Sequence, residues 1–224
     1  MEKFRRSLAL VVLTCSLACA AAAADDPTVL PKYGSGQKTE AQLAADAALL
    51  AAVDRMYGGD RNKAAQSAVA HGWHAFRAGR YAQAMRRFNQ AWLIDASNGQ
   101  AYWGMGAVRG ASGKSQEALL LLQEAAPLVG DDIDFEVDFA RALGLAGVES
   151  GNEVFVRDAF SRFESIHQRA PENMSNLHNW AILLFARGDY AEAWSRIKLV
   201  ERAPRGNQVD PAFIAALQAR MARP

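Results

Sequence analysis

Residues 79–95, which read GRYAQAMRRFNQAWLID, indicate the architecture of the whole chain. A glycine and a tyrosine typical of a turn come first, and Ala84, Phe88 and Ala91 then follow at spacings of four and three. Residues at these spacings lie on one face of a helix. Because Ala84 and Ala91 are small, a second helix can approach closely, while Phe88 fills the space between them. The stretch therefore predicts one half of a packed helical pair.

The features of this stretch recur at an interval of about 34 residues. The sequence GDYAEA around Tyr190 mirrors GRYAQA around Tyr81, but it comes about seven residues later than three such intervals. The same interval relates further small or apolar residues, namely Gly79, Gly113 and Gly147; Gly72, Gly106 and Ala140; Ala84 and Ala118; Phe88 and Leu122; Ala91 and Ala125; Ala159 and Ala193; and Phe163 and Ile197. A chain with such a period predicts a stack of similar units.

This order of glycine, tyrosine, alanine, aromatic residue and alanine resembles the tetratricopeptide repeat (TPR), and the resemblance covers residues 65–207. It implies an all-α fold, a right-handed α-solenoid of about four tetratricopeptide helix pairs with N- and C-terminal capping helices. One pair is too small to bury its own apolar face, so several stacked pairs are needed for stability.

The repeats are expected at residues 65–98, at 99–132, from Ile133 onward and at 174–207. The third contains an insertion near 149–154, because the pattern returns late after Gly147. We expect these extra residues between the two helices of the pair, as a product of neutral drift or as a loop for a local contact. Residues 208–224 are predicted to form the C-terminal capping helix, with Phe213, Ile214 and Leu217 facing inward.

A helix over residues 40–57 is predicted to cover the open end of the stack, and 40–64 form this capping helix and its turn. Thr39 and Gln42 form a capping box at its start. The predicted buried stripe consists of Leu43, Ala47, Leu50 and Val53. Residues 25–39 contain prolines and glycines and are expected to form an extended lead-in.

Residues 1–24 are typical of a secretory signal peptide, with a basic start, an apolar stretch and a small-residue cleavage site at 22–24. We therefore expect an exported, periplasmic protein without a membrane span after processing; the alternative is an uncleaved anchor. Both cysteines, Cys15 and Cys19, fall in this segment. Lipidation of Cys19 would instead make the protein an outer-membrane lipoprotein.

The charge of the mature chain is close to neutral. Removal of residues 1–24 takes 3 of 25 basic and 1 of 24 acidic residues, which leaves 22 − 23 = −1. Such a chain has no electrostatic footprint for nucleic acid or for an anionic membrane. No nucleic-acid partner is therefore expected.

Several fragments resemble ligand sites, but each lacks a required part. The lead-in has no complete phosphate loop, and the glycines at 104–110 are out of step with a dinucleotide motif and lie within a predicted helix. His71 and His74 lack a third metal ligand. Asp134, Glu136 and Asp138 lack the glycine of a calcium loop and suit a first helical turn. No enzyme activity, cofactor or metal is therefore expected.

The resemblance implies a concave groove that is lined by the first helix of each repeat and binds a protein or peptide partner. The lysine and asparagine set with which some chaperone-binding members hold a terminal carboxylate is missing. The groove positions carried over are Gln66, Val69, Trp73, Phe76 and Arg77; Gln100, Trp103 and Ala107; Asp134, Val137 and Arg141; and Ser175, His178, Ile182 and Phe185. Alternatively, Trp73 and Phe76 pack against the helix at 40–57, and Trp103 against its neighbour.

The leading hypothesis is an exported, non-catalytic scaffold or adaptor. It predicts that Trp73→Ala combined with Trp103→Ala keeps helicity and loses the partner. The alternatives are an envelope enzyme, or an accessory subunit of an envelope enzyme complex, that uses the insertion in the third repeat, and a lipid-anchored envelope assembly factor.

Overall fold

The computed structural model describes residues 26–34, 36–202 and 209–224. Within these ranges the chain is all-helical and contains no strand, which confirms the all-α part of the predicted fold class. The expected signal peptide, with Cys15 and Cys19, lies outside the described residues. The elements are η1 (Pro27–Val29), η2 (Pro31–Tyr33), α2 (Glu40–Tyr57), α3 (Arg61–Arg77), α4 (Tyr81–Ile94), α5 (Gly99–Ala111), α6 (Ser115–Val129), α7 (Ile133–Ser150), α8 (Glu153–Arg169), α9 (Met174–Arg187), α10 (Tyr190–Arg202) and α11 (Pro211–Arg220).

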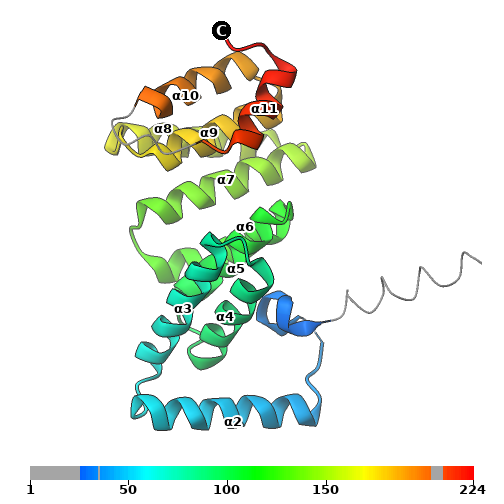
Figure 1. Ribbon diagram of the computed structural model, residues 1–224, viewed down its shortest axis with the longest axis vertical. Helices are drawn as coiled ribbons and strands as arrows, with labels where there is room; N and C mark the ends of the chain where they lie inside the picture. Colours follow the sequence, from blue (N-terminus) through cyan, green and yellow to red (C-terminus); the bar gives the residue numbers. More distant parts are fainter. Residues whose placement is uncertain (1–25, 35, 203–208) are drawn as a thin grey trace, which may run out of the picture.

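Helices α3 to α10 pack in adjacent pairs: α3 with α4, α5 with α6, α7 with α8, and α9 with α10. The pairs follow one another along the long axis of the molecule (Figure 1). In the first half of the stack, the second helix of each pair packs on the first helix of the next pair. This arrangement is consistent with a helical repeat. None of the described helices is long and apolar enough to cross a membrane.

Small residues bring neighbouring helices close together, as the sequence pattern predicts. The Phe88 side chain of α4 is 0% exposed and lies between Gly72 of α3 and Gly104 of α5. A Cβ atom at Gly72 would come within 2.5 Å of the Phe88 ring, and one at Gly104 within 2.2 Å. Gly106 meets Leu122 of α6 in a similar way, at 3.0 Å. The glycines therefore set the spacing between the helices.

The third pair is longer than the second: α7 and α8 have 18 and 17 residues, while α5 and α6 have 13 and 15. The expected loop at 149–154 is not present. Gly151 ends α7 in the left-handed conformation (φ 69°), and the Asn152 side chain caps α8 by accepting from the amide of Val154. The additional residues thus lengthen the helices and leave only a tight turn between them.

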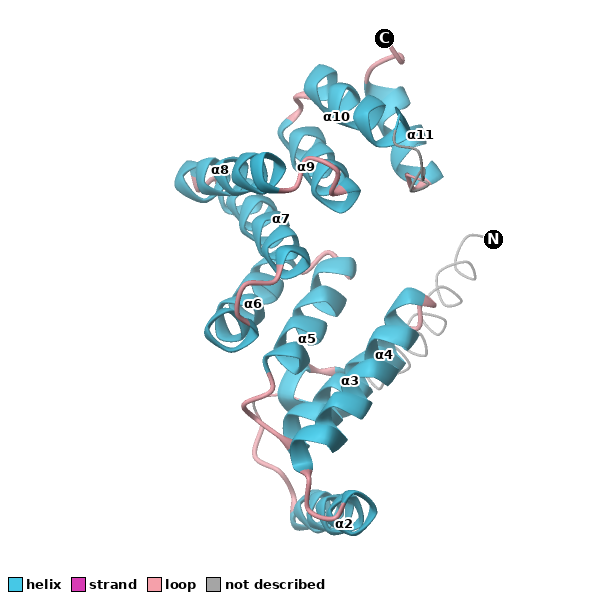
Figure 2. Cartoon of the chain, turned by 90° about the vertical axis from the view of Figure 1, so that its left-hand side faces the viewer, coloured by secondary structure: helices cyan, strands magenta, loops and turns pink. Residues whose placement is uncertain are grey.

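Helix α2 has the predicted bounds and the predicted capping box. The predicted buried stripe is only half right, because Leu43 is 54% exposed and Ala47 is also exposed, whereas Val53 is 7% exposed and Leu50 is partly buried. Figure 2 shows α2 end-on beneath α3 and α4, so that it crosses the end of the stack steeply. Only its C-terminal half therefore packs against the first pair.

The lead-in is docked on α4 and includes two 3-10 turns, so the expectation of a simple extended segment is corrected. The fully buried Asn89 side chain accepts from the Lys32 amide at 2.8 Å and donates to the carbonyls of Thr28 (3.0 Å) and Leu30 (2.7 Å). Arg86 pairs with Asp26 at 2.9 Å. A single asparagine thus holds the backbone of the segment on the helix.

Helix α11 closes the other end of the stack. Leu217 is fully buried, and Phe213 and Ile214 pack partly buried against the core, as predicted. The Trp194 indole of α10 donates to the Met221 carbonyl at 3.1 Å. The end of the chain is therefore fixed to the fourth pair.

Candidate functional site

The predicted groove aromatics of α3 and α5 form a row that continues into α7 through Phe135, which was not predicted. The Trp73 ring lies 5.6 Å from Phe76, 5.2 Å from Phe88 and 5.2 Å from Trp103, in edge-to-face arrangements. Trp103 in turn meets Phe135 at 5.5 Å. Such contacts are typical of a packed interior. The rings around Trp73 come from α3, α4 and α5, and Trp73 also packs against the cluster that contains Val53 of α2, as the alternative prediction expected.

Burial separates the predicted groove residues into two sets. Val69 and Trp103 are 8% exposed and Val137 is fully buried, so the prediction that these three present an open surface is wrong. Val69 belongs to a hydrophobic cluster built from α2, α3, α4 and α5, and Trp103 and Val137 belong to the cluster that extends from α5 to α11. The others retain exposed surface: Gln66, Arg77, Asp134 and Ser175 are exposed, and Trp73, Phe76, Gln100, Ala107, Arg141, His178, Ile182 and Phe185 are partly buried.

A cavity of about 100 Å³ lies between α5, α6 and α7, next to the end of α3. The repeat period explains it, because Ala107 and Gly110 occupy the places in α5 that Trp73 and Phe76 occupy in α3. Two large rings are thus replaced by a methyl group and a hydrogen. The cavity is lined by Phe76, Gly106, Ala107, Gly110, Ser115, Ala118, Leu122, Asp138, Arg141, Ala142 and Leu145.

Asp138 places a carboxylate in the wall of this cavity, where it accepts a hydrogen bond from the Trp103 indole at 2.8 Å. Burial raises the pKa of the Asp138 carboxyl, while the hydrogen bond from Trp103 and the charge of Arg141 act in the opposite direction. The prediction that Asp138 lies in the first helical turn is wrong, since only Asp134 and Glu136 lie there. The missed signal is that Asp138 shares a helix face with the apolar Phe135 and Ala142.

In the fourth pair, α11 covers part of the predicted groove. The Phe213 ring lies 5.7 Å from His178 and 5.6 Å from Phe185. The His178 Nε2 atom is buried and has no hydrogen-bond partner among the described residues. Burial lowers the pKa of His178, and the charge of Arg141 lowers it further, against the opposing effect of Asp210. His178 and Phe185 are thus closed in on the side of α11.

Within the described part of the chain, no group of three or more His, Cys, Asp or Glu residues has the geometry of a metal site. His71 and His74 are both exposed on α3, and the Nδ1 atom of His71 lies 2.7 Å from the Ser67 carbonyl oxygen.

Comparisons with known proteins do not extend this description, because no family model, no curated protein and no solved structure matched the chain. The fold and the cavity therefore define the molecule as an all-α protein of helices in adjacent pairs, with a recess between the first helices of its second and third pairs.

Proposed function

We propose that the chain is an exported, non-catalytic tetratricopeptide-repeat scaffold or adaptor, a right-handed α-solenoid of about four helix pairs, which binds a protein or peptide partner on its concave side. The cavity between α5, α6 and α7 carries this proposal. A recess with mainly apolar walls and a few polar groups is the kind of pocket that receives an anchor side chain. Here the polar groups include Asp138 and Arg141.

The size of the recess limits what it can accept. Since one water in the liquid occupies about 30 Å³, a cavity of about 100 Å³ has room for about three waters or one short side chain. The Asp138 carboxylate can accept a hydrogen bond and the Arg141 guanidinium can donate one. A small side chain with a hydroxyl or amide group fits this combination better than a bulky aromatic ring does.

Affinity capture from an envelope extract tests the proposal with one variant that fills the recess. Ala107→Leu adds three carbon atoms at its wall, and Ala126→Leu makes the same change at an exposed position of α6. We expect a protein that is enriched by the mature chain and by Ala126→Leu but not by Ala107→Leu. If all three baits enrich the same proteins, and circular dichroism shows that Ala107→Leu is folded, the recess is not the binding site.

An envelope enzyme is the second candidate, because a carboxyl with a raised pKa in a cavity is a recurring feature of catalytic sites. A panel of hydrolase substrates separates this candidate from the scaffold. Turnover by the mature chain that disappears in Asp138→Asn would favour the enzyme. Absence of turnover, together with partner capture that depends on Ala107, would favour the scaffold.

A further inference from the structure

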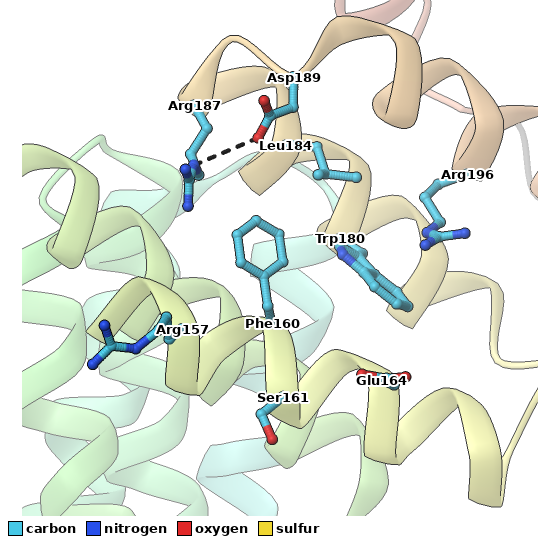
Figure 3. A pocket seen from close by; sticks show the side chains of 9 residues that line it. All are labelled: Arg157, Phe160, Ser161, Glu164, Trp180, Leu184, Arg187, Asp189 and Arg196. Carbon is cyan, nitrogen blue, oxygen red and sulfur yellow. Dashed lines mark ion pairs between the residues drawn. The ribbon is translucent and has the colours of Figure 1, made fainter. Parts of the chain in front are cut away.

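A second cleft, of about 490 Å³, lies between α8, α9 and α10, away from the recess at α5. Figure 3 shows its lining side chains: Phe160 lies between Trp180, which has Arg196 beside it, and the pair Arg157 and Arg187 on the other side. The lining residues are Arg157, Phe160, Ser161 and Glu164 of α8; Trp180, Leu184 and Arg187 of α9; Asp189 of the following turn; and Arg196 of α10.

The cleft exists because the fourth pair packs differently from the second and third. Helix α9 contacts α7 more extensively than it contacts α8, whereas α5 and α7 each pack mainly on the second helix of the preceding pair. The Trp180 ring stacks on Phe163 of α8 with an interplanar angle of 12° and a centroid distance of 6.1 Å. This pairing fills the base of the interface and leaves the space above it open.

Arg196 is held in place at the edge of the cleft. Its guanidinium lies 4.0 Å from the centre of the Trp180 ring, a cation–π contact that fixes the plane of the group. The Nε atom of Arg196 is buried and has no acceptor among the residues that the structure describes. A buried N–H without an acceptor is unfavourable. The Trp180 ring therefore orients the guanidinium, whose buried Nε atom is closed to solvent.

The other two arginines have donors to spare. Arg187 lies 3.5 Å from Asp189 and 3.7 Å from Glu153, both longer than the 2.7–2.9 Å of a good charge-assisted hydrogen bond. Arg157 is exposed and forms no ion pair within the described ranges. Three guanidinium groups and the two carboxylates of Glu164 and Asp189 line the cleft, so the lining itself carries one excess positive charge, while Glu153 lies beside Arg187 outside the lining.

We propose that this cleft binds an acidic segment of a partner protein, through aspartate or glutamate side chains that flank an apolar residue. Guanidinium groups match carboxylates in a planar, two-pronged geometry. The rings of Phe160 and Trp180 and the Leu184 side chain form an apolar floor for the neighbouring residue. This proposal does not depend on the function proposed for the recess.

Fluorescence anisotropy with the mature chain, residues 25–224, tests the proposal. The probe is a labelled, N-acetylated and C-amidated peptide in which glutamates alternate with leucine and phenylalanine; the control peptide carries glutamine at every glutamate position. We expect the glutamate peptide alone to bind, and its affinity to fall as the salt concentration rises. Equal binding of both peptides, or binding of neither, would overturn the proposal.

Variants assign the binding to the cleft. Arg157→Gln removes an exposed side chain and cannot disturb the core, whereas Arg196→Gln also removes the contact with Trp180. Each is expected to weaken binding by about tenfold. Arg55→Gln removes the same charge from α2, at the other end of the molecule, and should change the affinity less than about twofold. Equal losses in Arg157→Gln and Arg55→Gln, or stronger competition by inorganic phosphate than by the unlabelled peptide, would contradict the assignment.

Discussion

The contact between Gly104 and Phe88 gives the sharpest test of how the helices of this chain are spaced. A Cβ atom built at Gly104 lies 2.2, 2.3 and 2.4 Å from three atoms of the Phe88 ring, which is fully buried and cannot swing into solvent. At Gly110, in the same helix, the nearest atom to a new Cβ is that of Ala118 at 3.7 Å, an ordinary contact. The same Gly→Ala change therefore meets opposite surroundings within one helix.

The two substitutions are expected to change the free energy of unfolding in opposite directions. Alanine is intrinsically better than glycine inside a helix by about 1 kcal/mol. Gly110→Ala should therefore stabilise the protein by about 0.5–1 kcal/mol. At Gly104, overpacking of about 1–3 kcal/mol opposes this gain, and the closeness of three ring atoms places the cost near the upper end. We expect Gly104→Ala to destabilise by about 1–2 kcal/mol.

Urea unfolding of both variants, followed by circular dichroism, measures the difference. A double-mutant cycle with Phe88→Leu measures the coupling between the two positions. Because the smaller leucine relieves the clash, Phe88→Leu should cost about 1 kcal/mol less in the Gly104→Ala background than in the wild type. Similar stabilities for Gly104→Ala and Gly110→Ala, or strict additivity of Gly104→Ala with Phe88→Leu, would refute the view that glycine sets the helix spacing here.

Three further predictions concern the polar groups of the interior and the lead-in. Burial raises the pKa of Asp138 above 3.8, so that above this pH the folded state binds more protons than the unfolded state does. The stability that Asp138 contributes is therefore present below pH 3.8 and is lost as the pH rises through the raised pKa. Asp138→Asn, which keeps an oxygen for the Trp103 indole, should raise the melting temperature at pH 7 and leave it unchanged at pH 3. The lowered pKa of His178 has the opposite effect on stability: its contribution to the free energy of unfolding is present above pH 6.5 and is lost on acidification. His178→Gln should therefore make the stability depend less on pH below 6.5. Asn89→Ala removes three hydrogen bonds, which should cost about 1–3 kcal/mol and speed hydrogen exchange at the Lys32 amide; unchanged exchange there would contradict the assigned role of Asn89.

Features that depend on neighbouring residues in the chain could be predicted from the sequence. Thr39 and Gln42 mark the start of α2, and the recurrence of small residues predicts the paired helices, because caps and helix periodicity are local signals. The left-handed glycine and the capping asparagine at 151–152 are equally local, and they indicate a short turn between long helices in place of an inserted loop.

Features that depend on contacts between distant segments could not be predicted in this way. Asn89 is buried because residues 26–33 fold over it, and no local pattern connects the two segments. The recess, by contrast, could have been predicted from the sequence. Setting the repeats side by side places Ala107 and Gly110 opposite Trp73 and Phe76, and the loss of two rings predicts a space.

The position of the tryptophans decides which substitutions can test binding. Trp103 is 8% exposed and Trp73 contacts three other rings, so replacing each by alanine removes core packing worth about 3–5 kcal/mol. Two such losses approach the whole stability of a typical domain, about 5–15 kcal/mol. We therefore expect the double variant to lose cooperative unfolding along with any partner, so that its failure to bind would not identify a groove. Informative substitutions act from the solvent side, as Ala107→Leu does at the recess and Arg157→Gln at the cleft.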